Sequence, residues 1–296
     1  MTDLLIRPLV AGEETLFDSM PDPLPQLRQM GYADGLAGGG FRPEHTWVAL
    51  RSGRVVARAA WALPPGAVGA PWLERFDLDA EPEAGAALLR AAHEALGGPK
   101  VYYAAMPAHW RRRPEVLAVI EAPMAAARLA GLIERGERLR CTWTGTPLPA
   151  SSGRYTLRPA TDAAEINALV TRIPEPDVLT GREVALAVGG VDLATDPLSW
   201  LTGPPDRWLI ASAGGKPVGL AGTAGDACYP LLGYLGLLDD SVRGELLAEA
   251  VGVLSAGGAR EVVADVDAHR VAVVAELERT GFRQIRARVT FAPAPG

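Results

Sequence analysis

Cysteine and histidine are scarce in this chain, which has 2 Cys and 4 His among 296 residues. Two thiols, Cys141 and Cys228, can build neither a disulfide framework nor a multi-cysteine zinc site. Four imidazoles leave few further ligands for a metal. We therefore expect no metal site and a reducing, cytoplasmic location. Neither cysteine has a His at motif spacing, which argues against a thiol nucleophile.

Long hydrophobic runs and an excess of basic charge are also missing. The longest charge-free apolar stretch spans residues 227–238, whereas a bilayer-spanning helix needs about 20 residues. The N-terminus has no basic segment followed by an apolar one, so no signal peptide is expected. The net charge is −6, and phosphate backbones require a basic surface. Membranes and nucleic acids are therefore not expected as partners.

A duplication organises what is present. The segment around Arg7-Pro8 recurs around Arg158-Pro159, and the apolar hairpin pattern of residues 46–61 recurs at 207–222. Tight turns at Ser52-Gly53 and Gly214-Gly215 divide the two hairpins. These offsets of 151 and 161 residues between equivalent segments indicate two copies of one unit.

The remaining elements repeat in the same order. Helical apolar spacing with terminal glycines predicts two pairs of helices, at residues 83–98 and 244–258 and at residues 114–135 and 268–280. A strand is predicted between the helices of each copy, at residues 100–106 and 260–266. Residues 144–154 have linker composition. Each copy is thus a mixed α/β unit.

These elements resemble the GCN5-related N-acetyltransferase (GNAT) superfamily. Residues 229–238 (YPLLGYLGLL) are similar to its central fourth strand, Arg243-Gly244 to the start of its pyrophosphate-binding loop, and residues 277–282 (LERTGF) to its Gly-Phe helix end. The whole chain resembles tandem GNAT proteins of actinobacteria. The resemblance implies an α/β fold with a mixed sheet in two GNAT-like acyl-CoA N-acyltransferase domains, 1–145 and 154–296.

The resemblance also implies acetyl-CoA as co-substrate, in a V-shaped opening beside strand 229–238. Leu237 and Leu238 would offer backbone groups to the pantetheine. The helix start at Arg243, Gly244 and Glu245 would meet the pyrophosphate, because helix N-termini favour phosphate. However, the loop lacks the next glycine of the family pattern, and two carboxylates, Asp239-Asp240, precede it.

The loop of the first copy, residues 79–85, is acidic and lacks the arginine. We therefore expect the first domain to be a scaffold or to lie on the substrate side, and the C-terminal domain to be the better candidate for acetyl-CoA.

Three residues are candidates for catalysis. The usual acid of the family, a Tyr, is replaced by Leu277, so Tyr234 on the central strand is the nearest substitute; packing in the core is the alternative. His269 follows a strand end and could act as acid or base, although nothing orients it. Glu74 on the matching strand of the first copy could be a general base, or a solvated or ion-paired carboxylate.

For several other residues we expect structural roles rather than catalytic ones. Asp267 is expected to be a helix N-cap, Arg270 a surface residue, and the run Arg111–Arg113 a solvated helix entrance. The tryptophans of the hairpins, Trp47, Trp61 and Trp208, are expected in the core.

Two functions from different classes follow. The first is acetyl-CoA-dependent N-acetyltransferase activity on the amine of a small-molecule acceptor. The alternative is a catalytically inactive GNAT-fold protein that serves as a ligand-binding or protein-interaction module. The sequence is compatible with a monomer or a homodimer, and it identifies no acceptor.

Overall fold

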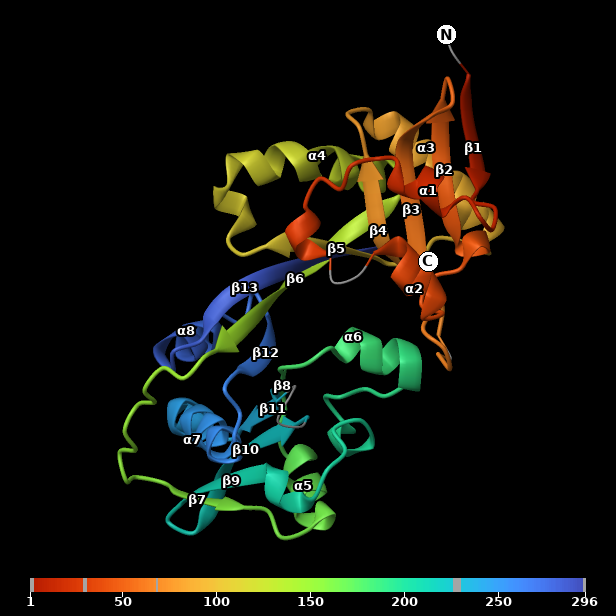
Figure 1. Ribbon diagram of the computed structural model, residues 1–296. Helices are drawn as coiled ribbons and strands as arrows, with labels where there is room; N and C mark the ends of the chain where they lie inside the picture. Colours follow the sequence, from red (N-terminus) through yellow and green to blue (C-terminus); the bar gives the residue numbers. More distant parts are fainter. Residues whose placement is uncertain (1–2, 29–30, 68, 226–229, 295–296) are drawn as a thin grey trace. The chain divides into compact units, whose positions relative to one another are not determined.

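The predicted order of strands and helices is present in the computed structural model, which describes residues 3–28, 31–67, 69–225 and 230–294 (Figure 1). Cys228 and Tyr229 lie outside the described residues. The chain divides into two compact units. Unit 1 comprises Met1–Glu137 and Ala287–Gly296, and unit 2 comprises Arg138–Arg286.

Unit 1 is built on strands in the order β1-β2-β3-β4-β5-β13. Its helices and strands are β1 (Leu4–Pro8), α1 (Glu14–Asp18), α2 (Tyr32–Ala37), β2 (Thr46–Arg51), β3 (Arg54–Ala62), β4 (Trp72–Leu78), α3 (Pro82–Ala95), β5 (Tyr102–Pro107), α4 (Pro114–Leu129), the start of β6 (Leu132–Trp143) and the end of β13 (Arg283–Pro293), with short 3-10 helices at Pro25–Leu27, Pro43–His45 and Trp110–Arg112.

Unit 2 has the strand order β6-β12-β11-β10-β9-β7, with β8 paired to β11. Its elements are the rest of β6 and the start of β13, β7 (Thr156–Pro159), α5 (Ala163–Val170), β8 (Asp177–Val178), α6 (Arg182–Val184), a π-helical turn (Ala185–Gly189), β9 (Trp208–Ala213), β10 (Lys216–Ala224), β11 (Leu231–Leu237), α7 (Arg243–Ala256), β12 (Val262–Asp267) and α8 (Val271–Arg279), with 3-10 helices at Pro197–Ser199, Pro205–Arg207 and Asp240–Val242.

The predicted hairpins are confirmed. In both turns the two central residues have positive φ: 52° and 79° at Ser52-Gly53, and 55° and 77° at Gly214-Gly215. This is the geometry of the type I′ turn, whose twist matches that of the flanking strands. The hairpin tryptophans Trp47, Trp61 and Trp208 are buried, as predicted.

The helix predicted at residues 114–135 is wrong at its end. The structure ends α4 at Leu129, and the chain turns at Gly131, whose φ is +88°, into β6. A glycine with positive φ just past the last turn is a common helix terminator. Strand β6 therefore begins at Leu132, inside the range predicted as helix.

Each unit buries a core on both faces of its sheet. In β3, Ala60 packs in a cluster with Phe17 and Tyr32 of α1 and α2, whereas the next residue, Trp61, meets His93 of α3. In β10, Leu220 packs with Ile166 of α5, and the adjacent Ala221 packs with Leu247 of α7. The alternation of neighbouring residues between opposite faces is the two-residue period of a strand.

Both units also share a bulge and a splay. The pairing of β3 with β4 skips Glu74, and the pairing of β10 with β11 skips Gly233. The central strands β4 and β5 are then joined in parallel at Leu73–Tyr102, and β11 and β12 at Leu231–Val263, with one register position described in each pair. A bulge increases local twist and bends the strand. In each unit the described parallel pairing thus lies near the start of the two strands, and the region between them beyond this pairing is called the groove of that unit.

The last strand of each sequence copy contributes to both units. Residues 138–143 of β6 pair with β12 in unit 2. Residues 287–293 of β13 belong to unit 1, where Phe291 stacks on Tyr102 of β5 with ring centroids 5.7 Å apart. The compact units thus differ from the domains expected at 1–145 and 154–296: unit 2 takes the end of β6, and unit 1 takes the end of β13.

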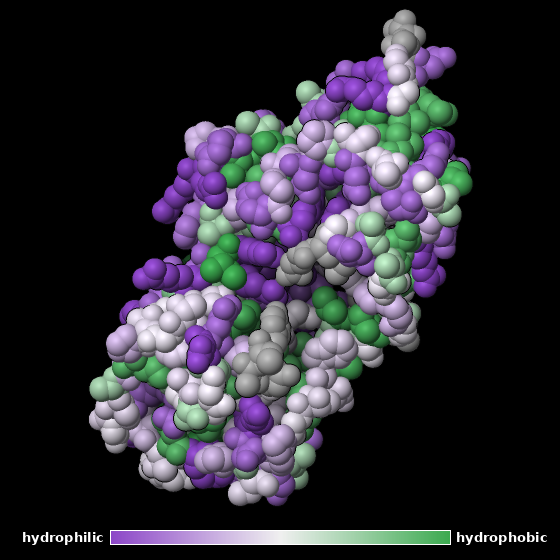
Figure 2. Space-filling view, in the orientation of Figure 1, coloured by the Kyte–Doolittle hydropathy of each residue, from purple (hydrophilic) through white to green (hydrophobic). Residues whose placement is uncertain are grey.

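The large apolar side chains exposed among the described residues are distributed over several helices, strands and loops. Exposed examples are Leu117, Leu129 and Ile133 in unit 1, and the face drawn in Figure 2 mixes hydrophilic and hydrophobic residues. Among the described residues, no helix combines the length and hydrophobicity needed to cross a bilayer.

Candidate functional site

The groove of unit 2 is filled by the chain itself. β8 pairs antiparallel with β11 through Val178–Tyr234 and Asp177–Leu235. The next residue, Leu179, donates its N–H to the Gly233 carbonyl on β11 at 2.9 Å, and its carbonyl accepts from the Asp265 N–H on β12 at 2.8 Å. Segment 177–179 therefore satisfies backbone groups of both diverging strands.

Burial holds this segment in the groove. Leu179 is 1% exposed and belongs to the same core cluster as Leu235, Val266 and Leu277. Val178 packs with Ala185 and Leu193. Burying a leucine side chain stabilises a fold by about 1.5–3 kcal/mol, so removal of segment 177–179 would expose a substantial apolar surface.

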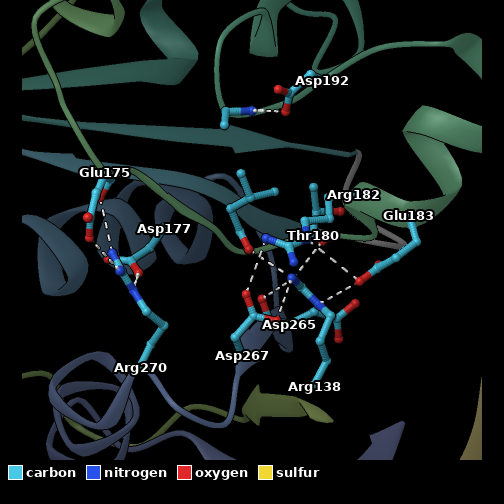
Figure 3. Close-up of polar contacts among 12 residues, drawn as sticks. Arg138, Glu175, Asp177, Thr180, Arg182, Glu183, Asp192, Asp265, Asp267 and Arg270 are labelled. Atoms are coloured by element: carbon cyan, nitrogen blue, oxygen red, sulfur yellow. Dashed lines mark hydrogen bonds and ion pairs between the residues drawn. The ribbon is translucent and has the colours of Figure 1, made fainter. Parts of the chain in front are cut away.

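A salt bridge fixes the start of β8. The Arg270 guanidinium donates to the buried Asp177 carboxylate at 2.5 Å and also contacts Glu175 (Figure 3). The hydrogen bond to Asp177 raises the pKa of Arg270. Arg270 was expected at the surface; it is instead partly buried, as the partner of a segment whose role the sequence did not reveal. It also occupies the N-cap of α8 expected for Asp267.

Arg138 fixes the other end of the segment. This buried residue of β6 donates to the carbonyls of Val178, Thr180 and Asp265, each at 2.9 Å. Its guanidinium also lies 3.3 Å from the Asp267 carboxylate and 3.7 Å from Glu183 (Figure 3). An arginine side chain has five N–H donors, so it can bond to several acceptors at once. Arg138 thus ties β8 to the end of β12.

The expected pyrophosphate loop faces carboxylates. Arg243 pairs with Asp240 at 2.5 Å. A Cβ at Gly244 would lie 2.5 Å from Oε1 of Glu276, so this carboxylate stands directly against the helix start. The Glu245 carboxylate accepts hydrogen bonds from Ser151 and Ser152. Burial opposes ionisation of Glu245, but these hydrogen bonds outweigh it and lower its pKa.

A further carboxylate caps this loop. Asp239 accepts from the N–H and the hydroxyl of Ser241, which lowers the pKa of Asp239. Of the carboxylates at this helix end, Asp240 pairs with Arg243 and Glu276 pairs with Arg279 at 2.6 Å. Asp239 and Glu245 are held by serines instead, so their negative charges oppose a pyrophosphate.

The backbone groups of Leu237 and Leu238, which were expected to contact the pantetheine, pair with strand β10. Leu237 pairs with Gly219 of β10, and the Leu238 N–H donates to the Val218 carbonyl at 2.8 Å.

The proposed catalytic residues of unit 2 lie in unlike environments. Tyr234 is fully buried against Trp208, with ring centroids 5.5 Å apart. Its hydroxyl has no hydrogen-bond partner among the described residues, and burial raises its pKa. His269 is exposed in the turn after β12, and Leu277 is fully buried. The burial of Tyr234 and its contact with Trp208 agree with the packing alternative.

Unit 1 has a different groove. There the 3-10 helix Pro25–Leu27, rather than a strand, contacts β5. A cavity of about 40 Å³ is lined by residues of this segment, β4, β5 and α4. Arg28 at its rim donates to Asp77 at 2.7 Å, and the buried Arg58 donates to the other oxygen of Asp77 at 3.0 Å. Glu74 lines the cavity and accepts from the Trp72 indole N–H at 2.9 Å.

The acidic loop of unit 1 is ion-paired. Arg51 makes a bidentate contact with Glu81 at 2.7 and 2.8 Å, and its hydrogen bond lowers the pKa of Glu81. Arg54 pairs with Asp79.

The arginine run after β5 is on the surface, as expected. Arg111 stacks on Trp110 and pairs with Glu137. Of the cysteines, Cys141 is buried, and desolvation raises the pKa of its thiol to about 12.

Acetyl-CoA does not fit the described residues of unit 2. The groove expected to hold the pantetheine contains segment 177–179, and the helix end expected to hold the pyrophosphate is lined with carboxylates. Asp177, Arg138 and Arg28, which shape the grooves, were missed in the sequence. The partners that hold them at the grooves lie 40 or more residues away, so no local spacing could identify them.

Comparisons with known proteins identify the fold. No protein-family model and no curated protein sequence matches the chain. The crystal structure of a GCN5-related N-acetyltransferase from Sphaerobacter thermophilus is similar over 99% of this chain and 96% of its own length, with 16% identity and a TM-score of 0.60. A tandem GNAT protein from the clavulanic acid biosynthesis pathway covers 99% of this chain and 100% of its own, with 17% identity and a TM-score of 0.47.

Proposed function

We propose that this protein binds a small ligand without transferring an acyl group, as a catalytically inactive member of the GNAT fold. The fold itself is confirmed, and a solved N-acetyltransferase has it. The observation that carries the proposal is segment 177–179, which bonds to both β11 and β12 where an acyl donor would have to lie. The carboxylates around α7 support the same conclusion, because they oppose a polyanionic cofactor. Acetyl transfer to a small amine is the other expected activity, and the position of segment 177–179 argues against it.

Acetyl-CoA titration of the full chain tests this proposal. We expect no calorimetric heat and no change of melting temperature at millimolar acetyl-CoA. A ligand present at 100 times its dissociation constant would stabilise the fold by about 2.7 kcal/mol, which is a shift of several degrees. Saturable binding, or acetyl-CoA-dependent acetylation of an amine, would overturn the proposal.

A variant identifies the cause. Arg270→Ala removes the partner of Asp177 and loosens the start of β8. If segment 177–179 is what excludes the donor, weak acetyl-CoA binding should emerge in Arg270→Ala. Arg260→Ala, at an exposed arginine between α7 and β12, should behave as the wild type. Identical behaviour of both variants would attribute the exclusion to the carboxylates alone.

A further inference from the structure

The cavity of unit 1 combines apolar walls with a carboxylate. Leu24, Leu27, Ile120 and Met124 supply apolar surface from the 3-10 helix and from α4, and Glu74 supplies charge from β4. Polar groups at the wall of a mostly apolar cavity are what fixes the orientation of a bound small molecule.

The described arginines around this cavity pair with other carboxylates and not with Glu74. The Arg28 guanidinium is shared by Asp22, at 2.8 Å, and Asp77, at 2.7 Å, and Arg58 completes the pairing of Asp77. Among the described residues, Glu74 has one hydrogen bond, from the neutral Trp72 indole to Oε2. Its Oε1 is therefore open to a partner, and no described cation is paired with it.

The position of Glu74 explains why it lies in the groove. It is the residue that the β3–β4 pairing skips, and bulges re-aim side chains. Its counterpart in unit 2, Gly233, has no side chain, and there Leu179 occupies the groove. A Cβ at Gly233 would lie 2.9 Å from Leu201, so a carboxylate cannot be placed there. The charged groove is thus a property of unit 1.

We propose that this cavity binds the charged end of a small organic cation, with Glu74 as its charge partner. An anion would be repelled by Glu74, and a neutral molecule would leave the carboxylate without a counter-charge. A water molecule requires about 10–15 Å³ of such volume, so about 40 Å³ admits roughly three groups of that size. An ammonium group with two or three carbons matches this volume.

This inference rests on the proposed function, since it names the class of ligand. Propylammonium is the probe, with propanol and propionate as neutral and anionic analogues of similar size, titrated into the full chain at pH 7 by calorimetry or ligand-observed NMR. We expect propylammonium to bind, and the two analogues to bind at least tenfold more weakly. Equal binding of propanol, or no binding of propylammonium, overturns the proposal.

Variants locate the site. Glu74→Gln should weaken propylammonium binding at least tenfold, whereas Glu121→Gln, an exposed carboxylate on α4 outside the cavity lining, should leave it unchanged. If Glu74→Gln fails to fold, Ala105→Leu, which keeps the carboxylate and fills the cavity, should abolish binding in a chain with native circular dichroism. Retained affinity in a folded Glu74→Gln or Ala105→Leu variant contradicts the assignment.

The two proposals can fail separately. If acetyl-CoA binds or propylammonium becomes acetylated, the inactive function is wrong, whatever the effect of Glu74→Gln. If acetyl-CoA does not bind and Glu74→Gln has no effect on the cation, only the cavity assignment is wrong.

Discussion

His93 of α3 is a buried imidazole that should make the protein sensitive to acid. It is 4% exposed and lies edge-on to Trp61, with ring centroids 5.8 Å apart. Burial, with a smaller contribution from the charge of Lys100, lowers the pKa of His93 to about 4. The unfolded chain binds this proton near pH 6.5. The contribution of His93 to stability is therefore complete above pH 6.5 and is lost as the pH falls from 6.5 toward 4.

Between pH 7.5 and pH 5, this linkage should lower the free energy of unfolding by about 2 kcal/mol. His93→Leu removes the titrating group, so its unfolding free energy should fall less than that of the wild type over the same interval. Urea unfolding at the two pH values measures the difference. His269→Gln, at an exposed imidazole, serves as the control and should follow the wild type; a His93→Leu protein that did so as well would contradict the assignment.

The elements show where sequence patterns are informative. Both hairpins, α3 and α7 follow from turn residues and apolar spacing, because their physical causes are local. Segment 177–179 does not follow from such patterns. Its strand β8 has two residues, between prolines and Thr180-Gly181, and two residues are too few to show the alternation of a strand. Its pairing depends on the divergence of β11 and β12, which is a tertiary property. The sequence predicts Glu74 as a candidate, but it leaves open whether the carboxylate is a general base or is ion-paired. Deciding this requires knowing that the nearby arginines, Arg28 and Arg58, pair with Asp77.

Packing against β10 gives an element-scale prediction. Gly222 lies under the Trp208 ring, and a Cβ there would come within 2.7 Å of two ring atoms. Gly222→Ala should therefore lower the free energy of unfolding by about 1–3 kcal/mol through overpacking. Gly252, in α7, has its nearest such neighbour at 3.6 Å, and Gly252→Ala should be neutral or stabilising by up to about 1 kcal/mol. Denaturant unfolding of both variants is the measurement; a Gly222→Ala protein as stable as the wild type would refute the packing argument.

At the scale of the whole molecule, the duplication predicted the fold class but not the exchange of strand ends. Repeats in a sequence indicate equivalent elements; they do not indicate which sheet each strand end joins. β6 and β13 are long strands whose residues belong partly to one unit and partly to the other. A boundary drawn at the Pro-rich linker therefore separates β12 from its partner on β6.

This composition predicts how fragments behave. Fragment 154–296 lacks residues 138–143, whose backbone pairs with β12 from Val262–Trp143 to Asp267–Arg138. Fragment 138–286 contains all residues of unit 2. We expect 138–286 to unfold cooperatively and 154–296 to be less stable and to aggregate, because an unpaired strand edge recruits other chains. Circular dichroism melts and size-exclusion chromatography compare the two. Equal melting temperatures would show that β6 contributes little to unit 2.

The place of β13 in unit 1 also bears on synthesis. β5 ends at Pro107, and its neighbour in the sheet, residues 287–293 of β13, is made 180 residues later. At about 5–20 residues per second the ribosome needs roughly 10–40 s to cover that distance. During this time the β5 edge of the unit 1 sheet has no neighbouring strand, although unit 1 begins the chain. Every residue of unit 2 is made before the residues of β13 that complete unit 1. The order in which the two units can be completed is therefore the reverse of the order in which their first residues are made.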